Sequence, residues 1–363
     1  MPPPSDPEFL VTQATVSDST GLVEALRRLA EGSSLSAAET AAAFGVVMRG
    51  EAAPGQIAAL LMGLRAKGES SDEIAGAAAA LRAAMVPVSI ADPDRLVDTC
   101  GTGGGTVATL NISTAAAFVV AGAGVPVAKH GNRSYTTRSG SADLLEALGV
   151  DIAVPPDRAP AVLEAAGLVF LFAPNYHPAM RHVAPTRREL GVPTIMNLLG
   201  PLANPAGVRR QVVGVADPLR APRVADALRR LGAVHALVVH GVIGMDEISP
   251  VGDTAVWEIR EGRLSEWTLD PGAFALHADG LDGLRGGSPA ENAARVERLL
   301  RTGEGEAERA AVLLNAAAAL YVSGAACSFA DAAERARRAL ESGAGGRVLD
   351  RLREAAPAVS TSG

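Results

Sequence analysis

The chain contains a glycine-rich segment, Gly101-Thr-Gly-Gly-Gly-Thr106, of a type that binds phosphate groups. Closely spaced glycines let backbone N–H groups approach phosphate oxygens, and a helix that begins near Ser113 would add its positive end. The segment is not a P-loop, because no GxxxxGK[ST] occurs. It fits a degenerate dinucleotide-binding fingerprint, but the acidic residue that would bind the ribose about twenty positions further along the chain is missing. The segment therefore predicts phosphate binding, and a simple strand-to-helix turn is the alternative.

Lys129 is one of only two lysines among 33 basic residues, the other being Lys67. It follows an apolar stretch of strand length and precedes His130-Gly-Asn132 and a loop rich in hydroxyl groups. An ammonium group is a compact hydrogen-bond donor that suits pyrophosphate. We therefore favour phosphate binding for Lys129 over the alternative, a surface lysine beside a polar loop.

Further along the chain, Asp246 and Glu247 are adjacent carboxylates that follow a predicted strand. Mg²⁺ is usually held by one or two carboxylates together with water and phosphate oxygens. An acidic pair at a helix N-terminus is an equally common alternative.

His177 and the pair Arg187-Arg188 could orient a carboxylate substrate through paired N–H bonds, with a solvated basic helix face as the alternative.

These side chains need elements that position them. From residue 21 to 85 the apolar residues have helical spacing, and Ser36-Ala-Ala-Glu39 and Ser70-Ser-Asp-Glu73 are capping boxes. Strands are predicted at 96–99, 125–128, 168–172, 211–215 and 235–240, and an antiparallel hairpin turns at 261–262. Helices are predicted from Ser113 or Thr114 to 120, at 222–231 and from 288 onward.

The fold class that this pattern predicts is α/β: a small N-terminal helical lobe, then a doubly wound, largely parallel sheet flanked by helices. Ligands of such sheets bind at the carboxyl ends of the strands. Four polar segments follow predicted strands, so we expect them to share one rim: residues 101–106, 129–132, 175–177 and 244–247.

Composition limits the class of protein. The 363 residues are 48% hydrophobic, which excludes a disordered chain, and the net charge of −7 argues against broad binding to nucleic acid or anionic membranes. The longest apolar stretch, 115–128, is too short and too interrupted to span a bilayer. Two cysteines cannot form a disulfide framework, and no cluster has zinc-ligand spacing, so we expect a cytoplasmic protein without a signal peptide.

The sequence resembles the anthranilate phosphoribosyltransferases. The resemblance runs in the family's order from about residue 21 to the C-terminal helices and rests on several motifs: LMGLRAKG (61–68), DEIAG (72–76), DTCGTGG (98–104), NIST (111–114), KHGNR (129–133), GSADLLEALG (140–149), HPAM (177–180), PTIMNLLGPLANP (193–205) and GMDE (244–247).

The resemblance implies transfer of the 5-phosphoribosyl group from phosphoribosyl pyrophosphate (PRPP) to the amine of anthranilate, which gives N-(5-phosphoribosyl)anthranilate and pyrophosphate in tryptophan biosynthesis. It also implies a nucleoside phosphorylase/phosphoribosyltransferase-like fold, two Mg²⁺ ions per subunit and a homodimer through the helical lobe. The expected organisation is a disordered tail (1–20), a helical lobe (21–91) completed by a helical segment near 184–207, and an α/β domain (92–357) that binds PRPP and metal.

The family's functional residues map onto matching positions. The catalytic set is Lys129, Asp246 and Glu247, and the metal set is Ser113, Asp246 and Glu247. The PRPP set is Gly101, Thr102, Gly103, Gly104, Thr109, Asn111, Ser113, Thr114, Lys129, Thr136 and Thr137. The anthranilate set is Gly101, His130, Asn132, His177, Arg187, Gly200 and Pro201, with Arg187 expected to pair with the carboxylate.

Two positions depart from the family pattern. Gly105-Thr106 stands where the family usually has Asp-Gly, and Thr136-Thr137 replaces the usual Ser-Ser. Three alternatives stay open: a pyrimidine nucleoside phosphorylase, which would need no metal, a non-catalytic relative that binds nucleic acid, and a paralogue that acts on a substituted anthranilate, for which Gly105 is the only hint. The pair Asp246-Glu247 argues against the first, and the net charge argues against the second.

Overall fold

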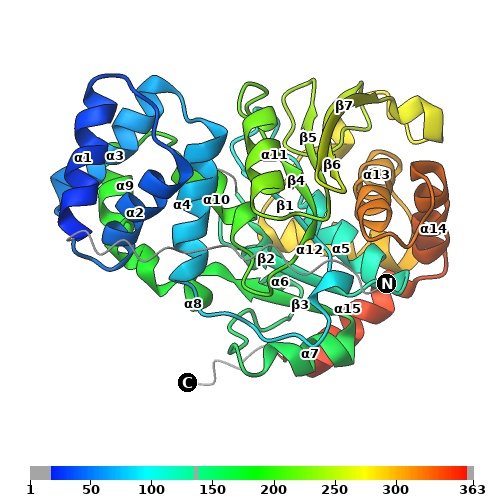
Figure 1. The fold of residues 1–363 in the computed structure, drawn as a ribbon. Coiled ribbons are helices and arrows are strands. Elements are labelled where there is room, and N and C mark those ends of the chain that lie inside the picture. The colour runs from blue at the N-terminus through cyan, green and yellow to red at the C-terminus, as the bar shows by residue number, and fades with distance from the viewer. Residues whose placement is uncertain (1–17, 135–137, 358–363) are drawn as a thin grey trace, which may run out of the picture.

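A computed structural model describes residues 18–134 and 138–357 (Figure 1), so the predicted phosphate ligands Thr136 and Thr137 lie outside the described residues. A helical lobe lies beside a larger α/β domain, as the sequence predicts. No helix in the described ranges is long and apolar enough to cross a membrane.

The helical lobe is built from α1 (Asp18–Ala30), α2 (Ala37–Met48), α3 (Pro54–Lys67) and α4 (Ser71–Ala83). Helix α1 begins three residues before the predicted boundary at residue 21. The predicted capping boxes are present at Ser36 and Ser70. A later stretch of chain returns to the lobe, where α9 (Ala184–Leu190) contacts α3 and α10 (Met196–Leu199) contacts α4.

The sheet of the α/β domain is largely parallel. Strands β1 (Asp98–Gly101), β4 (Arg210–Gly214) and β5 (His235–Gly241) pair in parallel, and the antiparallel hairpin of β6 (Thr254–Arg260) and β7 (Arg263–Leu269) extends the β5 edge. Strands β2 (Val127–Gly131) and β3 (Leu168–Phe172) form a parallel pair, which a bridge between Val97 and Val127 joins to the chain just before β1. The predicted doubly wound fold is confirmed.

Two of the predicted strands are displaced along the chain, whereas the others match to within one residue. The first two strands begin and end two or three residues later than predicted, so Lys129 lies inside β2 and not beyond it. Apolar residues before these strands are buried without belonging to the ladder, as Leu96 and Val125 are. The polar residues that replace them in the strands are tolerated because their side chains have partners inside the protein.

Helices cover both faces of the sheet. Alternate strand residues point to opposite faces, so Val212, Leu237 and Val256 enter one core while Val213, Val238 and Trp257 enter the other. The first core contains α5 (Ile112–Gly122) and α13 (Glu306–Val322), and the second contains α11 (Ala221–Arg230) and the helical lobe. The remaining helices are α6 (Ser141–Ala147), α7 (Ala159–Ala166), α8 (Ala173–Tyr176), α12 (Pro289–Thr302), α14 (Phe329–Glu341) and α15 (Ala344–Ala355), with short 3₁₀ turns η1 (Pro93–Arg95), η2 (Pro178–His182), η3 (Gly200–Leu202), η4 (Pro271–Phe274) and η5 (Asp282–Leu284).

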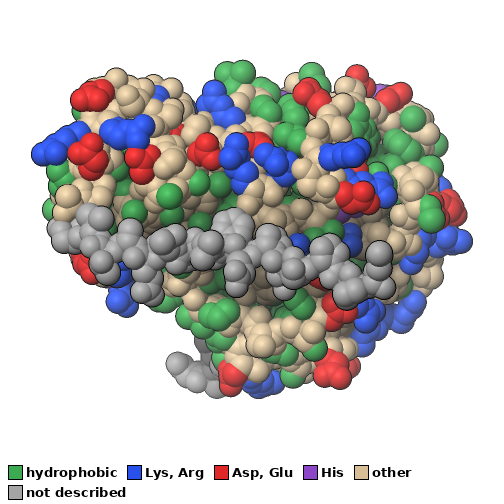
Figure 2. All heavy atoms as spheres, in the orientation of Figure 1, with side chains coloured by type: hydrophobic (Ala, Val, Ile, Leu, Met, Phe, Trp, Pro, Cys, Tyr) green, Lys and Arg blue, Asp and Glu red, His purple; other side chains and the backbone are tan. Residues whose placement is uncertain are grey.

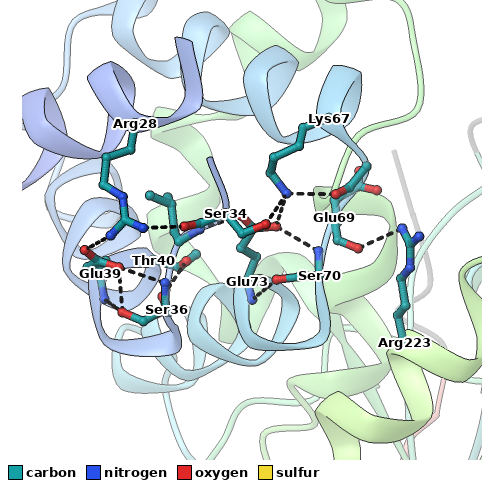
Figure 3. Close-up of polar contacts among 12 residues, drawn as sticks. Arg28, Ser34, Ser36, Glu39, Thr40, Lys67, Glu69, Ser70, Glu73 and Arg223 are labelled. Atoms are coloured by element: carbon teal, nitrogen blue, oxygen red, sulfur yellow. Dashed lines mark hydrogen bonds and ion pairs between the residues drawn. The ribbon is translucent and has the colours of Figure 1, made fainter. Parts of the chain in front are cut away.

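The lobe and the α/β domain also meet through charged groups. Arg220 donates to a carboxylate oxygen of Glu69 at 3.0 Å. Figure 3 shows the second contact, in which Arg223 on α11 donates to the Glu69 carbonyl at 2.9 Å. Arg230 pairs with Asp72 at 2.8 Å. Because the same helices share an apolar core, these contacts fix how α4 lies on α11.

Lys67, the second lysine of the chain, has a structural role in the lobe. Its ammonium donates to Glu73 at 2.8 Å and to the carbonyl of Gly68 at 2.9 Å (Figure 3). The Glu73 side chain is fully buried and also accepts from the backbone N–H groups of Leu35 and Ser70. The pair therefore joins the turn between α1 and α2 to the turn between α3 and α4.

Replacing this carboxylate should destabilise the lobe. In Glu73→Gln the Lys67 ammonium loses its opposite charge, and we expect the free energy of unfolding to fall by about 2–3 kcal/mol. Urea unfolding followed by circular dichroism measures the change. Glu24→Gln is the matched control, because the Glu24–Arg27 pair is exposed and should contribute little. Equal stability of the two variants would contradict the assignment.

Candidate active site

The four predicted polar segments meet at one rim of the sheet. The N–H of Gly103 donates to Asp246 Oδ2 at 2.9 Å, and the N–H of Ser113 donates to Glu247 Oε1 at 3.1 Å. The Lys129 ammonium donates to Ser113 Oγ at 3.2 Å. These bonds join residues 101–106, 129–132 and 244–247. The fourth segment, 175–177, reaches the same rim because His177 lies next to His130.

The glycine-rich loop folds directly onto the turn that carries the carboxylates. Gly101 ends β1, and the N–H of Thr102 then donates to the carbonyl of Gly214 at 2.8 Å. Gly103 and Gly104 both have φ above +70°, a conformation that favours glycine. The N–H of Thr106 donates to the carbonyl of Gly244 at 3.0 Å, which closes the loop.

Gly105, the departure from the family pattern, contacts the same turn. A Cβ added at this position would lie 3.0 Å from Asp246 Oδ1 and 3.2 Å from the carbonyl oxygen of Gly244. A larger residue would require Asp246 to shift by a few tenths of an ångström. Glycine at 105 therefore allows the loop to lie close to Asp246.

The carboxylates of Asp246 and Glu247 are crowded by protein atoms although each keeps some exposed surface. Burial raises the pKa of Asp246, and burial together with the neighbouring Asp246 raises the pKa of Glu247 to about 8. Both groups therefore favour a nearby positive charge.

These side chains fit a magnesium site. Carboxylate and hydroxyl oxygens are hard ligands, and Ser113 supplies the hydroxyl next to Glu247. Within the described ranges there is no group of three or more His, Cys, Asp or Glu side chains that could hold a metal. Water and substrate oxygens would have to complete the coordination, as is usual for Mg²⁺.

Lys129 is almost completely buried, with 2% of its surface exposed. Its ammonium also donates to the carbonyl of Thr99 in β1. Strand β2 extends to Gly131 because it pairs residue by residue with β3, where Lys129 lies opposite Phe170. The strand therefore carries this charge beneath the N-terminus of α5.

Helix α5 begins at Ile112 with Asn111 at the N-cap position, so the prediction that Ser113 or Thr114 caps it is wrong. Thr114 is buried within the first turn. The Asn111 side chain instead exchanges hydrogen bonds with Ser139 and accepts one from Asn292 at 3.1 Å. These bonds tie the start of α5 to two distant parts of the chain.

A cavity of about 550 Å³ opens beside the glycine-rich loop. Thr109, one of the predicted phosphate ligands, lies in its wall. Ser139, from the hydroxyl-rich loop after Lys129, also lines the cavity, together with residues that were not predicted to have a role: Arg138, Arg285, Gly286 and Asn292. The paired glycines at 286–287, just before the capping box of α12, were a signal that could have drawn attention to this wall.

His130 and His177 lie at the other end of the rim, with ring centroids 5.0 Å apart. Burial lowers the pKa of His130 to about 3 and that of His177 to about 4, so both rings are neutral near pH 7. His130 Nδ1 lies 3.0 Å from the carbonyl oxygen of Gly200, next to Pro201. Within the described chain, both ring nitrogens of His177 are buried without a hydrogen-bond partner. Such buried polar atoms are suited to a ligand.

Of the other predicted acceptor-site residues, Asn132 follows β2 and is half-buried, and Arg187 is half-buried on α9. Sequence reasoning missed Asn204, which donates to Asp98 and to the carbonyl of Ala128, both at 2.8 Å. Because Asp98 and Ala128 belong to β1 and β2, these bonds hold the segment after Pro201 against the sheet.

Gly214, at the end of β4, is restricted to glycine because a Cβ there would overlap the carbonyl group of Asp246. We expect Gly214→Ala to displace the carboxylate turn and to weaken binding of magnesium pyrophosphate at least about tenfold, a loss typical of supporting groups around metal ligands. Isothermal titration calorimetry measures this. Gly55→Ala is the control, because a Cβ at Gly55 meets open space. Unchanged binding by the Gly214 variant would show that the turn is not needed.

Comparison with known proteins agrees with this geometry. Residues 23–85 match the helical bundle domain of the glycosyl transferase family, and residues 93–345 match its a/b domain. The anthranilate phosphoribosyltransferase of Thermomicrobium roseum is 51% identical over 90% of this chain and 94% of its own length. That of Rubrobacter xylanophilus is 49% identical over 91% of this chain and 96% of its own length.

Solved structures show the same relationship. The crystal structure of anthranilate phosphoribosyltransferase from Thermus thermophilus is 44% identical with a TM-score of 0.86, covering 91% of this chain and 98% of that one. The Saccharomyces cerevisiae enzyme in complex with PRPP and Mg is 29% identical with a TM-score of 0.84, covering 93% and 98%. The chain therefore belongs to the anthranilate phosphoribosyltransferase family, the phosphoribosyltransferases of tryptophan biosynthesis.

Proposed function

We propose that this chain uses the rim described above to transfer the 5-phosphoribosyl group from PRPP to the amine of anthranilate. The bond between C1 of the ribose and the pyrophosphate oxygen breaks, a bond from C1 to the amine nitrogen forms, and the amine releases one proton to solvent. One observation carries the proposal: the glycine-rich loop and the start of α5 donate hydrogen bonds to a single pair of half-buried carboxylates, and Lys129 donates to the Ser113 hydroxyl beside them.

Departure of pyrophosphate is the step in which most charge develops. Groups that neutralise this charge in the transition state accelerate the reaction more than groups that bind the substrate uniformly. Lys129 supplies a fixed positive charge with little exposed surface. Further donors are N–H groups of the loop and of the first turn of α5 other than those of Thr102, Gly103, Thr106 and Ser113, which already donate inside the protein. PRPP is therefore assigned to Gly101, Thr102, Gly103, Gly104, Thr109, Asn111, Ser113, Thr114 and Lys129, with Thr136 and Thr137 expected from the sequence.

Magnesium is assigned to Asp246, Glu247 and Ser113, at two ions per subunit. The support is the hard-oxygen character of these groups and the charge that Asp246 and Glu247 concentrate at one place. The yeast relative has been solved with PRPP and Mg, and one of its variants with Mg. When bound, Mg²⁺ neutralises charge on the leaving pyrophosphate.

Anthranilate is assigned to the end of the rim that contains His130, Asn132 and His177, with Gly101, Gly200, Pro201 and Arg187. The yeast relative has been solved with 4-fluoroanthranilate. Neutral imidazoles with strongly lowered pKa values are weak bases near pH 7. Because an aniline nitrogen already carries a free lone pair, these residues act by placing the amine near C1 and not by removing its proton.

We also expect the chain to form a homodimer through the helical lobe and to work in the cytoplasm. Figure 2 shows acidic and basic side chains interspersed over the visible face of the described residues, which is unlike the continuous basic groove that nucleic acid prefers.

The purified chain should consume anthranilate when supplied with PRPP and Mg²⁺, which is measured as loss of anthranilate fluorescence. Removing the metal with EDTA should abolish the reaction, and added Mg²⁺ should restore it. Phosphorolysis of thymidine without metal would instead support a nucleoside phosphorylase. Turnover only with substituted anthranilates would assign the chain to a specialised pathway.

Lys129→Met should lower kcat/KM by about 10²–10³-fold, because it removes a buried charge that stabilises the leaving group. The loss should be accompanied by weaker binding of PRPP in calorimetry. Lys67→Met is the matched control: it removes the other lysine and should lower stability while leaving the affinity for PRPP unchanged. If Lys129→Met bound PRPP as the unchanged chain does, the assignment of Lys129 would fail.

A further inference from the structure

The cavity beside the glycine-rich loop has one wall from the loop between β7 and α12, which contains none of the motifs recognised in the sequence. The N–H of Leu110 donates to the carbonyl of Leu284 at 2.8 Å, and the N–H of Gly286 donates to that of Ala108 at 3.1 Å. Between these bonds, Thr109 and Arg285 form an antiparallel bridge. The backbone of Arg285 is therefore held directly opposite a predicted phosphate ligand.

A second arginine fixes this wall from behind. Arg295 on α12 donates to the carbonyls of Gly283 and Arg285, both at 2.5 Å, and to Glu308 on α13 at 3.0 Å. Gly286 is also constrained, because a Cβ there would lie only 2.5 Å from the carbonyl oxygen of Thr109. Since Arg295 already anchors the loop, the side chain of Arg285 is not needed for that purpose.

The cavity has the electrostatic character of an anion site. Its described lining contains two arginines, Arg138 and Arg285, and no acidic residue, although the whole chain carries a net charge of −7. Ser139 and the almost fully buried Asn292 add polar groups to the lining. Arg285 pairs with Asp282 at 3.2 Å, and both side chains are largely exposed. Exposed pairs of this kind are weak, so a phosphate group with two charges would compete well for the guanidinium.

We propose that Arg285 is a substrate-binding residue whose guanidinium leaves Asp282 and binds a phosphate group of PRPP in this cavity, which Arg138 also lines. The proposal rests on the proposed function and adds to it a ligand from a distant part of the chain. The phosphate is either the pyrophosphate or the 5-phosphate of the ribose, because a guanidinium recognises both in the same way.

Two neighbouring substitutions have opposite expected effects. Arg285→Gln should raise the Kd for PRPP about tenfold and raise the KM for PRPP while leaving the KM for anthranilate unchanged, because a charged hydrogen bond is lost. Asp282→Asn removes the competing carboxylate and should leave the Kd unchanged or lower it. Arg285→Lys should recover part of the affinity, and Arg263→Gln, an exposed arginine on β7, is the control for loss of surface charge.

Calorimetry with PRPP and Mg²⁺ decides between the roles. Equal weakening in Arg285→Gln and Asp282→Asn would mean that the pair only supports the loop, and an unchanged Kd in Arg285→Gln would also overturn the proposal. Titrations with magnesium pyrophosphate and with ribose 5-phosphate identify the phosphate that Arg285 binds. If Arg285→Gln weakens the binding of one of these ligands, that ligand contains the phosphate and the proposal is supported. If it weakens the binding of neither, the proposal is overturned. If the wild-type chain fails to bind PRPP, the proposed function itself is refuted. If the wild-type chain turns over normally and Arg285→Gln binds PRPP with the same Kd, only the role of Arg285 is refuted.

Discussion

Asp246 and Glu247 are adjacent carboxylates in a site where burial disfavours their charged forms, and much of the structure around them supplies the compensation. Two backbone N–H groups donate to the pair, one from the glycine-rich loop and one from the start of α5. Lys129 lies behind Ser113 and adds a full positive charge. The concentrated negative charge suits magnesium, and Lys129 and the positive end of α5 suit phosphate groups bound to that metal. The constraint of partly burying two carboxylates thus produces the features that the proposed binding site needs.

Maintaining that pair depends on close approach of backbone segments. The carboxylate turn lies against Gly214 at the end of β4 and against Gly105 in the loop, and neither position has room for a larger side chain without movement. Strand pairing between β1 and β4 brings Gly101 level with Gly214, which fixes the loop next to the turn. The site is therefore a property of sheet register as much as of its own side chains.

The helical lobe is continuous with one face of the sheet. Val213 and Trp257 from the sheet share a core with Phe44 and Leu60 of the lobe. One ion pair joins α4 to α11, and a second joins the residues just before these two helices. The segment that contacts His130 passes from the lobe to the sheet, where Asn204 binds Asp98. The residues proposed to bind the acceptor thus lie where the two parts of the molecule meet.

Local patterns were enough to predict the fold class, the order of the elements and the segments that form the rim, because hydrophobic periodicity and glycine and capping patterns depend only on nearby residues. The sequence also singled out Lys129 through the near absence of lysine, and Asp246-Glu247 through their position after a strand. The folded chain was needed to show that Lys129 lies within β2, that Asn111 and not Ser113 stands at the start of α5, and that Arg285 faces Thr109. Strand ends depend on pairing with β3 and β4, and the cavity wall depends on a contact between residues far apart in the chain. Such contacts leave no periodic trace in a single sequence, since what fixes them is the packing of one segment on another.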